Sequence, residues 1–265
     1  MQPPAAGVVL SVNVGRPREV PARNGDGTVT TAIWKEPVEA RVEVRGVNLA
    51  GDDQADRNVH GGPDKAVYAY AEEDYHWWAT ELGRPLGPGT FGENLTLRGV
   101  AVTDAVVGER WAVGTCELEV CQPRTPCSKL GLRMGDVSFP RRFTVAGRPG
   151  AYLRIVTEGE LGVGDEVVVL HRPAHGLTVG TVPQARTRAG RALLPRLLEA
   201  PELATSWSAW AVERAIEHLQ QDPEDAALRT ALRARLLDEG VEAAAVDALF
   251  ADLPAQGEEM GPPPG

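Results

Sequence analysis

The stretch from Cys121 to Leu130 contains the residue types and spacing best suited to chemistry. It reads Cys-Gln-Pro-Arg-Thr-Pro-Cys-Ser-Lys-Leu and lies between a strand pattern and a short helical pattern. Pro126 suits the first turn of a helix, which puts Cys127 at a helix N-terminus. Free backbone N–H groups and the helix dipole favour a thiolate there. A thiolate binds soft metals or attacks electrophiles, so Cys127 is a candidate for either role.

The same region carries an unusual charge. The whole chain has a formal net charge of −10, yet the residues between Cys121 and Pro149 are strongly basic. One acidic residue, Asp136, stands against six cations: Arg124, Lys129, Arg133, Arg141, Arg142 and Arg148. This local reversal predicts an anionic ligand near Cys127.

The other two cysteines fit structural roles. Cys116 shares the apolar face of its strand pattern with Leu118 and Val120. Cys121 falls on the opposite face, after the alternating residues, and we interpret it as structural too. The residues alone leave Cys127 open between a reactive thiolate and a small buried apolar side chain, the commoner role of a free cysteine.

Two further segments have chemical character. Residues 56–70 contain a Gly61–Gly62 pair, which lets a backbone approach a ligand closely, with His60 and Lys65 on either side. Residues 89–95 contain Asn94, whose amide can both donate to and accept from the edge of a heterocycle. An ordinary glycine turn and a plain loop explain these two segments equally well.

The elements that must position these residues are mainly β. Residues 8–14, 38–44, 116–120, 151–155 and 167–170 have strand patterns, the last of them apolar enough to be buried on both faces. Short helices are expected over 72–82, 128–134 and 140–145. Many short strands separated by turns predict a barrel or sandwich over residues 7–172.

The pattern changes to helical after Pro173. Residues 184–199, 207–220, and two stripes starting near 228 and 241 have helical spacing, which predicts a small helical domain over 180–252. The Pro- and Gly-rich ends, residues 1–6 and 253–265, are expected to be disordered tails.

Composition excludes several classes of protein. A net charge of −10 argues against a nucleic-acid binder or a ligand of anionic membranes. Apolar runs fall far short of the roughly 20 residues of a membrane span. Three cysteines do not make a disulfide framework. We therefore expect a cytoplasmic protein with free thiols.

Five segments, taken in order, resemble the MOSC domain, the C-terminal domain of molybdenum cofactor sulfurase, and specifically its YiiM-like branch. The segments are residues 11–17, 34–38, 60–68, 91–95 and 122–127, and the resemblance spans residues 8–171 and extends into the helices that follow. It implies a mainly β fold, a MOSC-type β-barrel with short helices over its mouth, followed by a small C-terminal α-helical bundle.

The resemblance also implies a cofactor. A molybdenum atom would be held by the dithiolene of a molybdopterin and by one protein cysteine, here Cys127. From charge and motif, we expect basic residues to bind the phosphate of the cofactor: Arg16, Lys35, Lys65, Arg124 and Arg142. His60 and Asn94 would orient the pterin or the substrate, which makes Cys127, His60 and Asn94 the expected catalytic set.

Related proteins in this branch reduce N-hydroxylated bases such as 6-hydroxylaminopurine, with electrons from a flavoprotein reductase. The resemblance therefore implies a molybdenum-dependent N-hydroxy reductase, and a homodimer is plausible. Two alternatives remain: a carrier or binding module for the cofactor without turnover, and a sulfur carrier with a persulfide on Cys127. The family's association with pyridoxal phosphate comes from the sulfurase, and this chain is too short and too β-rich to contain such an enzyme domain.

The sequence departs from the family pattern at two places. Ser128 stands where relatives often have a bulky aromatic residue after the ligand cysteine, which leaves the substrate preference open. Residues 221–252 add one or two helices to the usual module, and we interpret them as an extension of the bundle.

Overall fold

The computed structural model describes residues 5–22, 27–55, 61–251 and 253. Contacts divide the chain into two compact units, Met1–Pro183 and Gln184–Gly265. Within the described residues, no helix is both long enough and apolar enough to cross a membrane.

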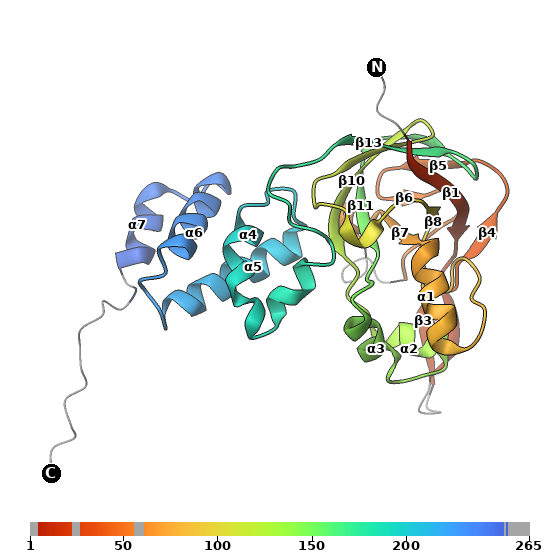
Figure 1. The fold of residues 1–265 in the computed structure, drawn as a ribbon, viewed down its shortest axis with the longest axis horizontal. Helices are drawn as coiled ribbons and strands as arrows, with labels where there is room; N and C mark the ends of the chain where they lie inside the picture. The colour runs from red at the N-terminus through yellow and green to blue at the C-terminus, as the bar shows by residue number, and fades with distance from the viewer. Residues whose placement is uncertain (1–4, 23–26, 56–60, 252, 254–265) are drawn as a thin grey trace, which may run out of the picture. The chain divides into compact units, whose positions relative to one another are not determined.

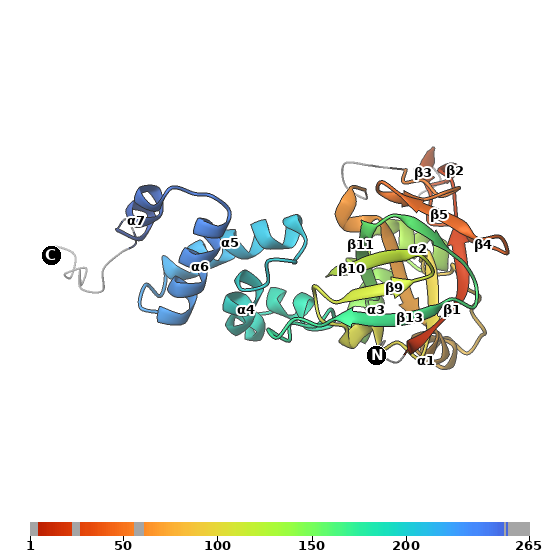
Figure 2. The same ribbon diagram turned by 90° about the horizontal axis from the view of Figure 1, so that it is seen from above.

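The first unit contains a closed seven-stranded β-barrel (Figures 1 and 2), as the sequence predicts. Neighbouring strands run in the order β13-β9-β10-β11-β7-β8-β1, and β1 pairs with β13 to complete the ring. The barrel strands are β1 (Ala5–Val14), β7 (Val67–Ala71), β8 (Leu95–Arg98), β9 (Arg110–Val113), β10 (Cys116–Pro123), β11 (Ala151–Thr157) and β13 (Glu166–His171). Adjacent strands are antiparallel except β7 and β8, which are parallel and are joined through helix α1 (Glu72–Leu82).

Smaller strands surround the barrel. β4 (Glu36–Val38) pairs with the end of β1. β2 (Arg18–Pro21) and β3 (Thr28–Thr31) form a hairpin, and β5 (Val42–Arg45), β6 (Asn48–Leu49) and β12 (Gly159–Leu161) form a three-stranded sheet.

Strand β7 shows how the sequence builds two cores from one strand. All five of its side chains are buried, because successive residues point to opposite faces. Val67, Ala69 and Ala71 belong to the aliphatic core of the barrel. Tyr68 and Tyr70 belong to a second, aromatic core with Trp78, Phe91 and Phe143. The first core fills the barrel, and the second packs helices against its outside.

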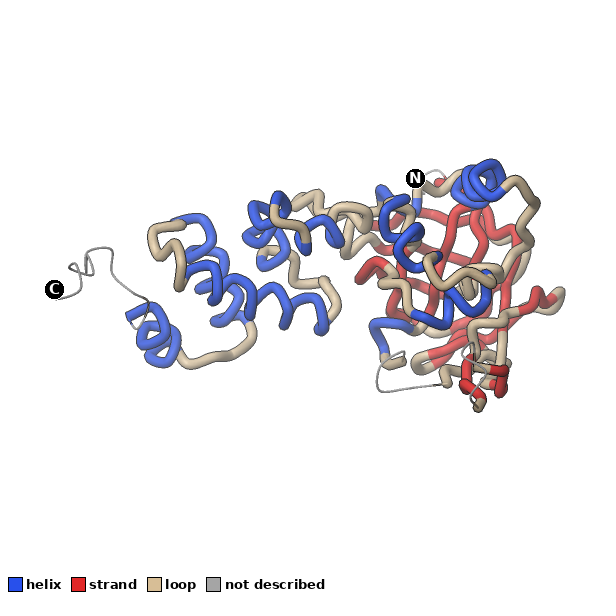
Figure 3. Tube along the Cα trace, turned by 90° about the horizontal axis from the view of Figure 1, so that it is seen from below, coloured by secondary structure: helices blue, strands red, loops and turns tan. Residues whose placement is uncertain are grey.

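Three helices contribute to the aromatic core and gather at one end of the barrel (Figures 1 and 3). They are α1, α2 (Ser128–Met134) and α3 (Phe139–Ala146). Single turns of 3-10 helix, η1 (Pro63–Lys65) and η2 (Val102–Asp104), precede β7 and β9.

The second unit is helical. It begins within η3 (Val182–Arg186) and continues with η4 (Ala189–Leu193), α4 (Leu194–Leu198), α5 (Thr205–Leu219), α6 (Ala226–Asp238) and α7 (Ala243–Ala251). The predicted leucine stripe of the third helix is buried at Leu228, Leu232 and Leu236. Its N-cap is Asp225, whose side chain accepts a hydrogen bond from the Leu228 N–H.

The structure corrects several local predictions. The strand predicted over 38–44 is interrupted at residues 39–41, where Arg41 turns to bind Asp165 and the carbonyl of Glu160. Leu170 is 47% exposed, so β13 is not buried on both faces along its whole length. The helix predicted over 184–199 is broken into short turns, because the backbone of Gly190 lies against that of Gln184.

The predicted boundaries also shift. Residues 173–183 belong to the first unit, because Leu177 and Val179 exchange backbone hydrogen bonds with Val107 and Ala105. At the N-terminus, the predicted disordered tail reached residue 6, whereas Ala5 already pairs with Val168 in the barrel. Residues 1–4 and 254–265, the rest of the predicted tails apart from Leu253, lie outside the described residues.

Candidate functional site

A pocket in the barrel unit collects residues from four of the five segments that carry the family resemblance. Its empty volume is about 600 Å³, including the open solvent at its mouth. The lining comes from residues 31–35, 52–55, 65–68, 92–94, 124–129 and 152. The fifth segment, residues 11–17, forms hydrogen bonds to two lining residues: the Gly15 N–H donates to Asp52, and the Asn13 carbonyl accepts from Asn94.

Cys127 lines this pocket as a partly exposed free thiol. It is the N-cap residue of α2, with an extended backbone, and its carbonyl accepts a hydrogen bond from the Leu130 N–H. Pro126 therefore precedes the cap and does not lie in the first turn. The predicted placement of the thiol at a helix start agrees with the structure.

The buried guanidinium of Arg124 lies at the same pocket. Its Nη1 donates to the carbonyl of Phe91, and its guanidinium carbon is 5.1 Å from the ring centroid of Tyr68. Its Nε is buried with no hydrogen-bond partner, and Arg124 makes no ion pair with any described carboxylate. A buried cation without a protein counter-charge is costly, and an anionic ligand would relieve that cost.

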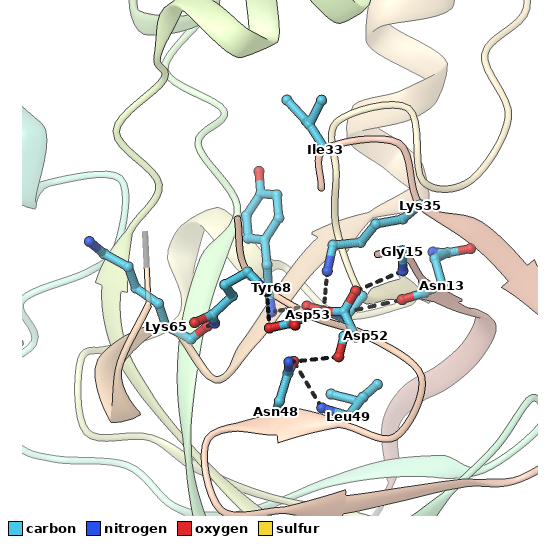
Figure 4. Close-up of polar contacts among 12 residues, drawn as sticks. Asn13, Gly15, Ile33, Lys35, Asn48, Leu49, Asp52, Asp53, Lys65 and Tyr68 are labelled. Carbon is cyan, nitrogen blue, oxygen red and sulfur yellow. Dashed lines mark hydrogen bonds and ion pairs between the residues drawn. The ribbon is translucent and has the colours of Figure 1, made fainter. Parts of the chain in front are cut away.

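A buried ion pair joins Lys35 and Asp52, which both line the pocket (Figure 4). The other oxygen of Asp52 accepts a hydrogen bond of 2.8 Å from the Gly15 N–H. Burial lowers the pKa of Lys35, although the charge of Asp52 acts in the opposite direction. The carboxylate therefore ties the loop after β6 to the end of β1 and to the stretch before β4.

The side chain of Asn94 makes its hydrogen bonds to other groups of the protein. Its Nδ2 donates to Asp52 at 2.8 Å and to the carbonyl of Asn13 at 3.2 Å. Its Oδ1 accepts from the Tyr68 N–H at 3.0 Å. Both amide hydrogens are thus already engaged, so the expected hydrogen-bond donation to a heterocycle is not available in this arrangement.

Lys65 and Lys129 add two more cations to the pocket lining. Lys65 ends the η1 turn, whose position is fixed by β10. The Cys121 thiol donates to the carbonyl of Asp64 at 3.1 Å, and Gln122 Nε2 donates to the same carbonyl at 2.8 Å. Cys121 is fully buried, and burial raises its pKa, which agrees with the structural role expected for it.

Two predicted cofactor ligands lie elsewhere. Arg142 is on α3, near Glu81 and Asp136 and over the ring of Phe139, and does not line the pocket. Arg16 is exposed in the loop after β1 and does not line it either. His60 lies outside the described residues.

The basic stretch after Cys121 is therefore only partly explained by a ligand. Arg124 and Lys129 line the pocket. In contrast, Arg148 pairs with Asp74 on α1, and Arg133 lies over the ring of Trp34. Part of the basic stretch thus contacts acidic or aromatic side chains on other elements, which a count along the sequence does not show.

Asp52 is the main residue that the sequence analysis missed, and Tyr152 is another. Asp52 follows Gly51 in a short polar loop without periodicity, so its role depends on the segments that fold around it. One signal was present: a lysine predicted to be functional, Lys35, needs an acidic partner if it is buried. Tyr152 follows from the strand pattern, because it points away from the barrel core between Ala151 and Leu153.

Comparisons with known proteins agree with this fold and site. The MOSC domain family matches residues 56–168. The uncharacterized protein YflK of Bacillus subtilis is 34% identical over 204 residues, which cover 76% of this chain and 91% of YflK. A protein named Reductase from Gibberella moniliformis is 31% identical over 176 residues, which cover 64% of this chain and 30% of that protein.

A solved structure extends the likeness to three dimensions. The crystal structure of YiiM from Geobacillus stearothermophilus matches with a TM-score of 0.65 and 30% identity, over 78% of this chain and 98% of that one. The family match lies in the barrel unit, which contains the pocket and Cys127. The chain therefore belongs to the MOSC family, in its YiiM-like branch.

Proposed function

We propose that the pocket binds a molybdenum cofactor through Cys127, and that the protein reduces N-hydroxylated bases or related N–O compounds. The MOSC family is associated with molybdenum-cofactor binding. The observation that carries the proposal is that one pocket is lined by a partly exposed thiol and by a buried guanidinium that makes no ion pair with a described carboxylate. A cofactor that joins a sulfur-bound metal to a phosphate needs both groups.

The residues present fit such a cofactor. Cys127 would supply one sulfur ligand to the metal, and thiolate sulfur is a suitable donor for a soft metal. Arg124, Lys65 and Lys129 would bind the phosphate, with Arg124 offering a planar fork of N–H donors. Asp52 is already neutralised by Lys35, so this carboxylate does not repel the phosphate.

The reaction we propose consumes two electrons and two protons, and converts a hydroxylamine group into an amine and water. The bound cofactor would supply the redox chemistry. The chain would bind the substrate beside Cys127, where the next residue, Ser128, is small and exposed. The name of the Gibberella moniliformis relative, Reductase, supports a reduction. We propose a flavoprotein reductase as the electron donor.

The first test is the metal content of protein purified from a host that makes the cofactor. We expect equimolar molybdenum and pterin in the unsubstituted protein, and neither in Cys127→Ser. Cys116→Ser is the matched control, because Cys116 is buried in the barrel core and should leave the content unchanged. Molybdenum-free protein under these conditions would contradict the proposal.

A second measurement separates the enzyme from a carrier. Loaded protein with an artificial electron donor should reduce 6-hydroxylaminopurine, whereas a cofactor carrier would show molybdenum without turnover. A sulfur carrier would instead gain the mass of one sulfur atom on Cys127 after incubation with a cysteine desulfurase. Either of these results would replace the reductase assignment.

A further inference from the structure

A second pocket lies entirely within the helical unit. It is formed by residues 185–194, by one face of α5 and by Gln221, which lies two residues after the end of α5; its empty volume is about 780 Å³ including the mouth. No residue of the barrel unit lines it. It is therefore separate from the site around Cys127.

Arginines dominate this helical pocket. Arg186, Arg188, Arg191 and Arg214 line it, and Glu217 is the one acidic residue among the lining residues. The stretch 184–198 contains four arginines and no acidic residue, although the whole chain has a net charge of −10. Arg214 is paired with Glu213 and Glu217, but the charges of the other three arginines around the hollow repel one another, so the arrangement favours a bound anion.

Several of these groups have no partner in the described part of the chain. Arg188 and Arg191 are exposed and make no ion pair there. Two lining groups are buried without a hydrogen-bond partner: Nε of Arg214 and Nδ1 of His218. Buried polar groups are normally satisfied, so these two atoms mark a place for a ligand or water.

The remaining contacts hold the arginines in place. The guanidinium carbon of Arg186 is 4.1 Å from the ring centroid of Trp207 and 5.6 Å from that of Trp210. Arg214 is positioned by ion pairs to Glu213 and Glu217. Two of the four cations are thus oriented by the protein, which lowers the entropy lost when a ligand binds.

We propose that the helical pocket binds a small molecule through its phosphate groups. Guanidinium groups match phosphate oxygens with paired N–H donors, and several arginines together suit a di- or triphosphate better than a single carboxylate. The site is independent of the proposed cofactor site, and the failure of either proposal leaves the other intact.

The test is calorimetric titration of the full-length protein with inorganic pyrophosphate. We expect saturable binding that Arg191→Gln weakens by about ten-fold or more, as a lost charge-assisted hydrogen bond would. Because Arg191 is exposed and unpaired in the described chain, its substitution should leave folding intact, which circular dichroism checks. Arg188→Gln provides a second variant with the same expected effect.

Two control variants locate the binding. Arg233→Gln removes an exposed arginine from α6, outside the pocket, and should leave the affinity for pyrophosphate unchanged. Lys129→Gln removes a cation from the barrel pocket and shows whether the measured pyrophosphate is bound there instead. The proposal would be overturned if pyrophosphate did not bind, or if Arg233→Gln weakened its binding as much as Arg191→Gln does. It would also be overturned if only Lys129→Gln weakened the binding, or if citrate bound as tightly as pyrophosphate.

Discussion

The buried pair between Lys35 and Asp52 gives the sharpest prediction. The two side chains are 10% and 2% exposed, so neither is well solvated. Asp52→Asn leaves the charge of Lys35 buried without its partner, a change that costs about 3–5 kcal/mol in other proteins. In the unsubstituted protein Asn94 Nδ2 donates a hydrogen bond to Asp52, and the amide introduced at position 52 faces this same Nδ2 group. We expect the barrel to lose about 3–5 kcal/mol of its free energy of unfolding.

Hydrogen exchange read by mass spectrometry isolates this effect, because peptides from β10 report on the barrel unit alone. A loss of 3–5 kcal/mol accelerates exchange by roughly 10²–10³-fold or more at neutral pH. The double variant Lys35→Met/Asp52→Asn should recover part of the loss, since no buried charge remains. Glu43→Gln removes a partner from an exposed ion pair with Arg45 and should cost less than about 1 kcal/mol.

Two results would refute this reasoning. One is a loss below about 1 kcal/mol in Asp52→Asn, the range of an exposed pair. The other is a double variant whose loss equals the sum of the two single losses, since coupled partners must deviate from additivity. The penalty should also shrink as the pH rises toward 10.5, because the pKa of Lys35 is already lowered by burial and the lysine can then lose its charge.

Three further predictions follow from the barrel unit. Burial raises the pKa of all four tyrosines, which are Tyr68, Tyr70, Tyr75 and Tyr152. The folded state therefore keeps protons that the unfolded chain releases near pH 10.0, so the free energy of unfolding should fall above that pH, and tyrosinate absorbance should appear only with unfolding. Gly92→Ala places a Cβ 2.8 Å from Cγ1 of Ile33 at a φ of +76°, and should cost about 1–3 kcal/mol by hydrogen exchange, whereas Gly87→Ala meets no atom and should be nearly neutral. Arg124→Lys keeps the charge but loses the planar fork, so its molybdenum content should fall well below that of the unsubstituted protein; an unchanged content would remove Arg124 from the cofactor site.

Local patterns predicted the elements well where each one carries its own signals. The helix expected over 128–134 has the predicted bounds, because Gly135 ends it in the left-handed conformation that glycine tolerates best. The strand expected over 38–44 failed for the opposite reason. Val38, Val42 and Val44 keep the same alternation across a bend, so periodicity alone does not reveal the interruption at Arg41.

The site was less predictable than the fold. Cys127, Arg124 and Lys35 carry recognisable chemistry, and the structure brings them to one pocket. Asp52 has no local signature, because its importance arises from three segments that meet only in the folded chain. Arg142 shows the reverse error: its position in a basic stretch says nothing about the direction of its side chain, which lies near Glu81 and Asp136.

The ring of the barrel closes between β1 and β13, with Val8 opposite Glu166. During synthesis, β1 leaves the ribosome first and cannot complete its hydrogen bonds until β13 has followed it. In the interval, one edge of β1 stays open to solvent and to other strands, a state that favours association between nascent chains. The helical unit, which begins at Gln184, is made after β13, so translation of that unit provides the time in which the ring can close.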